Sequence, residues 1–317
     1  MRAAKTADDR RYCAGKAKEL GRLEEFPDYD LCDMHIHIMP GVDDGSKDMN
    51  MSVRMMDVAL DNAIGTMIVT PHHKGGHHNV SPAQQVQRID DMVDAAWDAG
   101  IRAMSWLDYR GDDGPELTGG SDYDSGGGIG YGGTRGPELI FYPGNEIMYD
   151  SGVAQRLEEG RIETMARSSY VLVEFRPEDP FARIQEGLRD LAWEGYHVIL
   201  AHCERYDCLR EDPDLARELW RSRIYLQVNA DSVLPQGAAG KLPGSLGIRT
   251  NPVARFVHDL LSDEKISFVS TDAHRDVGRA PYMLECWRML SGMYDPDYVR
   301  EITRENTLSV IRDEEIR

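Results

Sequence analysis

Short runs of apolar residues alternate along the chain with longer segments whose apolar positions recur at the spacing of a helix. Short apolar runs between polar residues are typical of buried strands, and the longer pattern is typical of helices that cover a sheet. The predicted strands are residues 29–38, 66–70, 138–142, 169–175, 197–201, 224–229 and 266–270. The predicted helices are residues 48–62, 82–99, 180–194, 213–220, 252–261 and 281–290. Roughly seven alternating units predict an α/β fold with a parallel sheet, closed into a distorted barrel more than left open.

The alternation stops between residues 111 and 136, where glycine and aspartate replace nearly all aliphatic residues. Such a segment cannot bury much apolar surface, so we expect a mobile surface insertion. It matches neither the P-loop nor the dinucleotide-binding fingerprint and contains no lysine, which disfavours a phosphate-binding loop. We therefore predict an N-terminal extension over residues 1–28 and a single domain over residues 29–317 that carries the insertion.

The charge balance is strongly acidic, with 36 lysines and arginines against 55 aspartates and glutamates and a formal net charge of −19. Nucleic acid and anionic membranes repel such a chain unless a basic patch or a bound metal reverses the local field. The 5 cysteines have neither disulfide-framework nor zinc-knuckle spacing, which favours a reducing cytoplasm. Neither a signal peptide nor an apolar run of membrane length is present, so we expect no membrane insertion.

Potential metal ligands follow nearly every predicted strand. In a parallel α/β barrel the carboxyl ends of the strands meet at one face, so these residues should converge. His35 and His37 stand two residues apart on an extended chain and therefore point to the same side. Glu174 lies inside an apolar run, where an unpaired carboxylate is costly and metal coordination offsets that cost. The candidate ligands are His35, His37, Asp44, His72, Glu146, Glu174, His202, Asp272 and His274.

This set of nitrogen and oxygen donors suits manganese, zinc or iron(II) better than a thiolate-bound structural zinc, and it suffices for two or three ions. His73, His77 and His78 crowd behind His72 and are expected to be surface residues. A cysteine-dependent phosphatase would need a Cys-x5-Arg phosphate cradle, and none of the cysteines has an arginine six residues later. Cys203, beside His202, is therefore expected to be a packed neighbour.

These motifs resemble the polymerase and histidinol phosphatase (PHP) superfamily, and within it the capsule-type bacterial metal-dependent protein tyrosine phosphatases. The run from Asp33 to Gly45 reproduces the opening Asp-x-His-x-His-x-x-Pro-Gly-x-Asp-Asp-Gly pattern. The resemblance covers residues 30 to about 311. The other matching runs are Thr70-Pro71-His72, Glu146-Ile147, Glu174-Phe175, Ala-His-x-Glu-Arg-Tyr over residues 201–206, Gln-x-Asn-Ala over residues 227–230, and Asp272-Ala273-His274 with Arg279.

The resemblance implies a PHP fold, which is a distorted (β/α)7 TIM-like barrel, and a site with up to three divalent metal ions. Manganese is favoured, with zinc, iron or cobalt as alternatives. Arg205 and Arg279 would hold the phosphate oxygens. The implied ion ligands are His35, His37, Glu146 and Asp272 for the first ion, Glu146, Glu174 and His202 for the second, and Asp44, His72 and His274 for the third.

The activity implied is metal-dependent hydrolysis of phosphotyrosine in protein, with the tyrosine-rich tail of a bacterial tyrosine kinase controlling capsule or exopolysaccharide synthesis as the expected partner. One alternative is a small-molecule phosphomonoesterase such as histidinol-phosphate phosphatase. Another is a non-catalytic phosphotyrosine-binding regulator, which the loss of a ligand would support, although none of the nine is lost. The resemblance leaves homo-oligomerisation open, and no nucleic-acid partner is expected.

Overall fold

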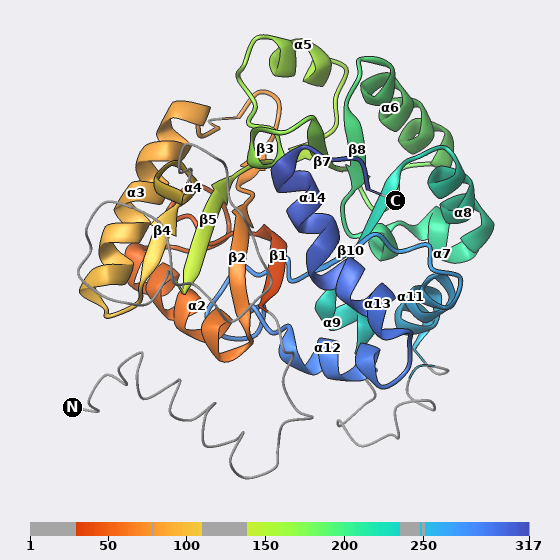
Figure 1. The fold of residues 1–317 in the computed structure, drawn as a ribbon. Coiled ribbons are helices and arrows are strands. Elements are labelled where there is room, and N and C mark those ends of the chain that lie inside the picture. The colour runs from red at the N-terminus through yellow and green to blue at the C-terminus, as the bar shows by residue number, and fades with distance from the viewer. Residues whose placement is uncertain (1–29, 78, 110–137, 235–247, 249–250, 317) are drawn as a thin grey trace.

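The computed structural model describes residues 30–77, 79–109, 138–234, 248 and 251–316 (Figure 1). The predicted N-terminal extension and the predicted insertion at 111–136 lie outside the described residues. Most of the predicted strands are present within a residue or two of their expected ends, and the strand pairs among the described residues are all parallel. The alternation of strand and helix therefore predicted the fold class correctly.

The strands form two sheets. The first has the order β1 (Leu31–Ile36), β2 (Ile64–Val69), β5 (Leu139–Pro143), β4 (Ala103–Ser105). The second has the order β10 (Phe268–Ser270), β9 (Tyr225–Asn229), β8 (His197–Leu200), β7 (Tyr170–Glu174), β6 (Glu146–Met148), β3 (His72–His73). The apolar pattern did not predict β3, β4 and β6, because strands of two or three residues are too short to establish a period.

The chain joins the two sheets on both sides. Two residues after β2 the chain enters β3, and two residues after β5 it enters β6, so each of these strands continues from one sheet into the other. At the opposite side a parallel bridge pairs Ile36 of β1 with Ala273, just beyond β10. Gly144 lies at one of these joints, where a Cβ atom would come within 2.9 Å of Ile68. The two sheets thus form the expected distorted α/β barrel.

The six predicted helices are all present. They are α2 (Met49–Asp61), α3 (Pro82–Asp98), α6 (Phe181–Trp193), α8 (Pro213–Arg221), α11 (Pro252–Ser262) and α12 (Leu284–Ser291). Local sequence fixes where several begin: Ser81 and Gln84 form a capping box at α3, and proline occupies the first turn of α3, α8 and α11. The shorter helices are α4 (Trp106–Tyr109), α5 (Val153–Glu158), α7 (Asp207–Glu211), α9 (Ala230–Val233), α13 (Pro296–Arg300) and α14 (Asn306–Arg312).

Both faces of the strands are buried, as expected for parallel sheets. Alternate strand residues pack against the surrounding helices in the larger apolar cluster. The other strand residues, among them Met34, Ile68 and Leu172, form a second cluster with Leu308 and Val310 of α14. Figure 1 shows α14 lying across the middle of the strands. Within the described part of the chain, none of the helices combines the length and apolar character needed to cross a bilayer.

Candidate metal centre

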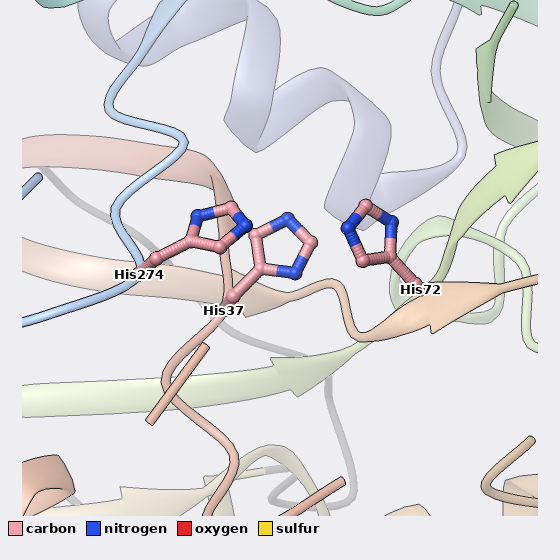
Figure 2. A group of neighbouring side chains, drawn as sticks. All are labelled: His37, His72 and His274. Carbon is pink, nitrogen blue, oxygen red and sulfur yellow. The ribbon is translucent and has the colours of Figure 1, made fainter. Parts of the chain in front are cut away.

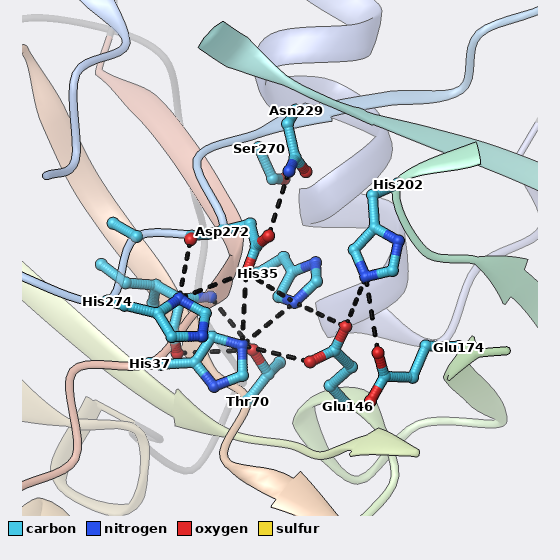
Figure 3. A network of polar contacts seen from close by, with 12 residues as sticks. His35, His37, Thr70, Glu146, Glu174, His202, Asn229, Ser270, Asp272 and His274 are labelled. Carbon is cyan, nitrogen blue, oxygen red and sulfur yellow. Dashed lines mark hydrogen bonds and ion pairs between the residues drawn. The ribbon is translucent and has the colours of Figure 1, made fainter. Parts of the chain in front are cut away.

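All nine predicted ligands lie at or beyond the carboxyl ends of strands from both sheets, and their side chains converge. Figure 3 labels seven of them, all except Asp44 and His72. His35 and His37 are fully buried, and their Nε2 atoms lie 3.3 Å apart. Glu146 faces both of them, with Oε1 3.3 Å from His35 Nε2 and Oε2 3.2 Å from His37 Nε2. Asp272 Oδ1 lies 3.6 Å and 3.5 Å from the same two nitrogens. These four residues form the first donor group.

A second donor group lies on the other side of Glu146. His72 Nδ1 is 2.8 Å from Glu146 Oε2 and 3.2 Å from Glu174 Oε1. His202 Nε2 lies 2.7 Å from Glu146 Oε1 and 3.7 Å from Glu174 Oε2. Glu146 is therefore shared between the two groups.

A third group brings together the rings of His37, His72 and His274 (Figure 2). The ring centroids of His37 and His274 are 4.0 Å apart, and those of His37 and His72 are 4.5 Å apart. Asp44 Oδ1 approaches from the loop after β1, 3.2 Å from His72 Nε2 and 3.7 Å from His274 Nε2. Asp44 is 70% exposed, whereas the side chain of His72 is 13% exposed.

The donor atoms fit divalent metal ions. Among the described residues, His72 Nδ1, Glu146 Oε2 and Glu174 Oε1 are buried and make no hydrogen bond, although they lie close together. The two carboxylate oxygens lie beside imidazole nitrogens without an aligned hydrogen bond, and burying them in this way is costly unless a cation contacts them. Mixed imidazole and carboxylate donors suit manganese, zinc or iron. The convergence therefore has the chemistry of a metal centre.

Electrostatic coupling within the cluster is strong. Burial lowers the pKa of His72, but the carboxylates of Glu146 and Glu174 outweigh it and raise that pKa to about 9. Burial would raise the pKa of Glu146, but His35 and the neighbouring imidazoles hold it well below its usual range. Burial and His37 lower the pKa of His274 to about 3. Protons and metal ions would therefore compete for the same donor atoms.

Asp43 orients this centre from outside the donor set, a role that the sequence did not suggest. Its Oδ2 lies 2.9 Å from His37 Nδ1, so His37 is left with Nε2 facing the cluster. The same carboxylate accepts hydrogen bonds from the backbone N–H groups of His72 and Gly45 at 3.0 Å and 2.9 Å. The sequence feature that could have revealed this role is the adjacent pair Asp43-Asp44. Asp44 faces the cluster, and Asp43 holds the loop.

Two candidate ligands have an unusual backbone conformation. His202 and Asp272 have positive φ angles of 33° and 49°. Left-handed conformations cost of order 1–3 kcal/mol for residues other than glycine and concentrate at functional sites. Hydrogen bonds hold both residues in place: the N–H of Asp272 donates to the carbonyl of His35 at 2.8 Å, and the N–H of His202 donates to Gln227 Oε1 at 2.6 Å.

The two predicted phosphate-binding arginines lie beside the cluster. Arg205 Nη2 donates to Asp272 Oδ2 at 2.6 Å, and Arg279 Nη2 donates to the same oxygen at 2.9 Å. Their side chains are 40% and 44% exposed. Arg279 Nη2 also donates to the backbone carbonyl of Asp272 at 3.2 Å. Each guanidinium has five N–H donors, so these contacts leave most of them available to an anion.

Comparison with known sequences decides the family. The profile of the family described as "Capsular polysaccharide synthesis, CpsB/CapC" matches residues 31–107 and 133–312. The chain belongs to the CpsB/CapC family. Among relatives of this CpsB/CapC chain, tyrosine-protein phosphatase YwqE of Bacillus subtilis (strain 168) is 28% identical over 287 residues, which cover 90% of this chain and 93% of the relative. Tyrosine-protein phosphatase CpsB of Streptococcus pneumoniae is 23% identical over 284 residues, covering 90% of this chain and 99% of the relative.

A solved structure has the same fold as the CpsB/CapC chain. A chain from the crystal structures of YwqE from Bacillus subtilis and CpsB from Streptococcus pneumoniae, described as metal-dependent tyrosine phosphatases, matches with a TM-score of 0.68 at 23% identity. The match covers 90% of this chain and 96% of that chain. The predicted barrel-type fold is therefore confirmed by an independent structure.

One expectation about the neighbourhood of the CpsB/CapC site is wrong. His73 is 3% exposed, because β3 pairs it with Ile147 of β6, and it is not a surface histidine. Burial lowers its pKa to about 4. His77 is exposed as expected, and His78 lies outside the described residues. Cys203 is fully buried and burial raises its pKa well above the usual range, which confirms it as a packed neighbour.

Proposed function

We propose that this CpsB/CapC protein is a metal-dependent phosphatase of the PHP superfamily that hydrolyses phosphotyrosine in proteins. The observation that carries the proposal is the buried convergence of imidazoles and carboxylates in which Glu146 Oε2 and Glu174 Oε1 have no hydrogen-bond partner. The substrate class rests on the relatives, which are named tyrosine-protein phosphatases. Residues 29–317 would form the single catalytic domain.

Two or three divalent ions would occupy the centre, with manganese as the first candidate. The first would be held by His35, His37, Glu146 and Asp272, the second by Glu146, Glu174 and His202, and the third by Asp44, His72 and His274. Support comes from three triplets of donor atoms that lie within 4.8 Å of one another, which are those of His35, His37 and Glu146, of His72, Glu146 and Glu174, and of His37, His72 and His274. His72 faces both the second and the third group, so its ring would stand between two ions.

When bound, the ions supply an activated water and offset negative charge on the phosphoryl oxygens. The chain itself does the rest. Arg205 and Arg279 lie beside the cluster, and their exposed guanidinium groups would orient the phosphate through charge-assisted hydrogen bonds. Asp272 Oδ2 accepts a hydrogen bond from each of the two arginines. These hydrogen bonds keep both guanidinium groups beside the donor groups before the substrate binds.

The protein partner would be the phosphorylated tail of a bacterial tyrosine kinase that controls capsule or exopolysaccharide synthesis, and the reaction would take place in the cytoplasm. The family description, capsular polysaccharide synthesis, supports this assignment. The acidic chain would repel a polyanion such as nucleic acid, whereas a cationic metal centre would attract a single phosphate group. A phosphorylated protein therefore suits the site better than a polyanionic backbone.

The test is an assay of the purified chain after removal of metal with a chelator. We expect no turnover of a phosphotyrosine peptide by the stripped protein, and recovery when manganese, zinc, cobalt or magnesium is restored. The activity of His35→Ala should remain at the level of the stripped protein, because the substitution removes the Nε2 atom that faces His37 and Glu146 in the first donor group. His77→Ala, which replaces an exposed histidine beyond β3, is the matched control and should recover fully.

Each other outcome is informative. Turnover of p-nitrophenyl phosphate without turnover of the peptide would replace the protein substrate by a small phosphomonoester. Tight binding of the phosphotyrosine peptide with no turnover would indicate a regulator. Failure of the wild-type chain to bind any of the metals would contradict the proposal as a whole.

A further inference from the structure

Two amide side chains on β9 lie between three of the candidate ligands and have no part in the scheme above. Gln227 and Asn229 belong to the Gln-x-Asn-Ala run, and they are 0% and 2% exposed. Both point to the same side of the strand, since they are two residues apart. Through them β9 contacts residues that follow β1, β8 and β10.

The orientation of the Gln227 amide follows from a backbone group. Gln227 Oε1 lies 2.6 Å from the backbone nitrogen of His202, and a backbone N–H can only donate, so this atom is the amide oxygen. The same oxygen lies 3.2 Å from His35 Nδ1. An amide oxygen can only accept, and therefore His35 Nδ1 carries the proton.

That assignment decides which nitrogen of His35 is free to bind a metal. In the neutral imidazole one nitrogen carries the proton and the other has the lone pair. With the proton on Nδ1, the lone pair is on Nε2. This is the atom 3.3 Å from His37 Nε2 and 3.3 Å from Glu146 Oε1, in the first donor group.

The same logic continues from Gln227 to Asp272. With its oxygen fixed, Gln227 donates through Nε2 to Asn229 Oδ1 at 3.0 Å. Asn229 must then donate through Nδ2 to Asp272 Oδ2, also at 3.0 Å (Figure 3). The backbone N–H of Asn229 donates to the buried Glu204 at 3.0 Å, which anchors this part of the strand. Together with Arg205 and Arg279, which donate to the same oxygen, Asn229 leaves Asp272 Oδ1 to face the imidazoles of His35 and His37.

We propose that Gln227 and Asn229 are positioning residues that fix the metal-binding nitrogen of His35 and the metal-facing oxygen of Asp272. The inference rests on the proposed function, because it requires a metal in the first donor group. It adds the part of the structure that holds two ligands, one on β1 and one just beyond β10, in one orientation. Hydrogen-bond partners of this kind fix the tautomer and orientation of the ligands and thereby govern metal affinity.

The first experiment measures manganese affinity of the full chain by competition with a chromogenic chelator. Gln227→Met keeps the approximate volume but removes the acceptor for His35 and the donor for Asn229. We expect about 10–100-fold weaker manganese binding, the usual effect of losing such a partner. Thr303→Val is the control, because Thr303 is also buried and its hydroxyl donates to the carbonyl of Val299 in its own helical segment, away from the candidate ligands. Its manganese affinity should be unchanged.

A second readout tests the chain of hydrogen bonds itself. If Gln227 orients Asp272 through Asn229, the losses of manganese affinity in Gln227→Met and Asn229→Ala should not add. The double variant should then have about the same manganese affinity as whichever single variant binds manganese more weakly. Losses that multiply would show two independent structural effects and would overturn the relay.

A measurement on the wild-type protein needs no variant to fold. In the zinc-loaded chain labelled with ¹⁵N-histidine, long-range ¹H–¹⁵N spectra should place the His35 proton on Nδ1; a proton on Nε2 would overturn the inference. The proposed function fails separately: if the wild-type chain binds no metal, both ideas are wrong. If the wild-type chain binds manganese and turns over phosphotyrosine while Gln227→Met binds manganese equally well, only the inference is wrong.

Discussion

At the scale of single residues, the sequence singled out the candidate ligands that the fold brings together, but not the orienting roles of the residues that contact them. His35 and His37 are recognisable because ligand types two positions apart on a strand face the same side. Their orienting partners are not, since His37 uses a carboxylate six residues away and His35 uses an amide 192 residues away. Only the folded loop and the neighbouring strand bring these groups together.

Asp43 gives a direct test of orientation as distinct from coordination. Asp43→Asn keeps the size of the side chain but removes the charge that faces His37 Nδ1. We expect manganese affinity to fall by about 10–100-fold, the range typical of such partners. The measurement is the same chelator competition, and Asp98→Asn, an exposed aspartate of α3, is the control. Unchanged affinity in Asp43→Asn would mean that the carboxylate only shapes the loop.

His258 offers a pH prediction away from the centre. Burial lowers its pKa below the usual value of 6.5, and its ring bonds to the carbonyl of Val233 at 2.9 Å and to the hydroxyl of Tyr294 at 2.6 Å. In the unfolded chain His258 takes up a proton near pH 6.5, whereas in the folded chain it does so only at lower pH. The contribution of neutral His258 to the free energy of unfolding is therefore fully present above pH 6.5 and is lost as the pH falls through the lowered pKa.

His258→Gln should therefore flatten the pH dependence of the free energy of unfolding below pH 6.5, by up to about 1.4 kcal/mol per pH unit. Urea unfolding of both proteins between pH 7.5 and pH 5 in the presence of chelator measures the difference, with the pH range chosen to bracket the usual value of 6.5. Parallel curves for the two proteins would contradict the assignment.

At the scale of elements, long strands and helices were predictable and short connecting strands were not. β3 and β6 hold His72 and Glu146, but they are only 2 and 3 residues long. They exist because the chain after β2 and after β5 crosses into the second sheet, which is a property of the whole barrel and not of local sequence. For the same reason His73 could be mistaken for a surface residue.

The loop that follows β1 depends on one glycine. A Cβ atom at Gly45 would overlap the carbonyl oxygen and Cβ of His37, so no side chain fits without moving a candidate ligand. We expect Gly45→Ala to weaken manganese binding and phosphatase activity by at least about tenfold, because such a displacement disturbs preorganised donors. Gly292→Ala is the matched control, since its nearest neighbour would be 3.4 Å away, and it should retain both properties.

At the scale of the whole molecule, the centre joins the two sheets. Its candidate donors lie at or beyond the carboxyl ends of β1, β2 and β5 in the first sheet and of β7, β8 and β10 in the second. Sequence predicted this convergence because the carboxyl ends of parallel strands meet at one face. The extension and insertion proposed from sequence stay predictions, because they fall outside the described residues.

Metal binding should therefore stabilise the whole fold. At a free manganese concentration of 100 times the dissociation constant, we expect about 2.7 kcal/mol of added stability, seen as a rise in the thermal midpoint over the chelated protein. His35→Ala should lose this rise, whereas His77→Ala should keep it. An equal rise in His35→Ala would indicate that manganese stabilises the chain from another place.

The exposure of Asp44 has a consequence for the timing of metal exchange. Asp44 is 70% exposed, whereas Glu146 and Asp272 are 1% and 2% exposed. Water and a chelator reach the third donor group from solvent, but reach the first group only after that region opens. We therefore expect a stopped-flow chase with excess chelator to release metal in two phases, with Asp44→Asn accelerating the fast phase and leaving the slow one unchanged. A single phase would mean that all bound ions leave through one shared opening of the barrel.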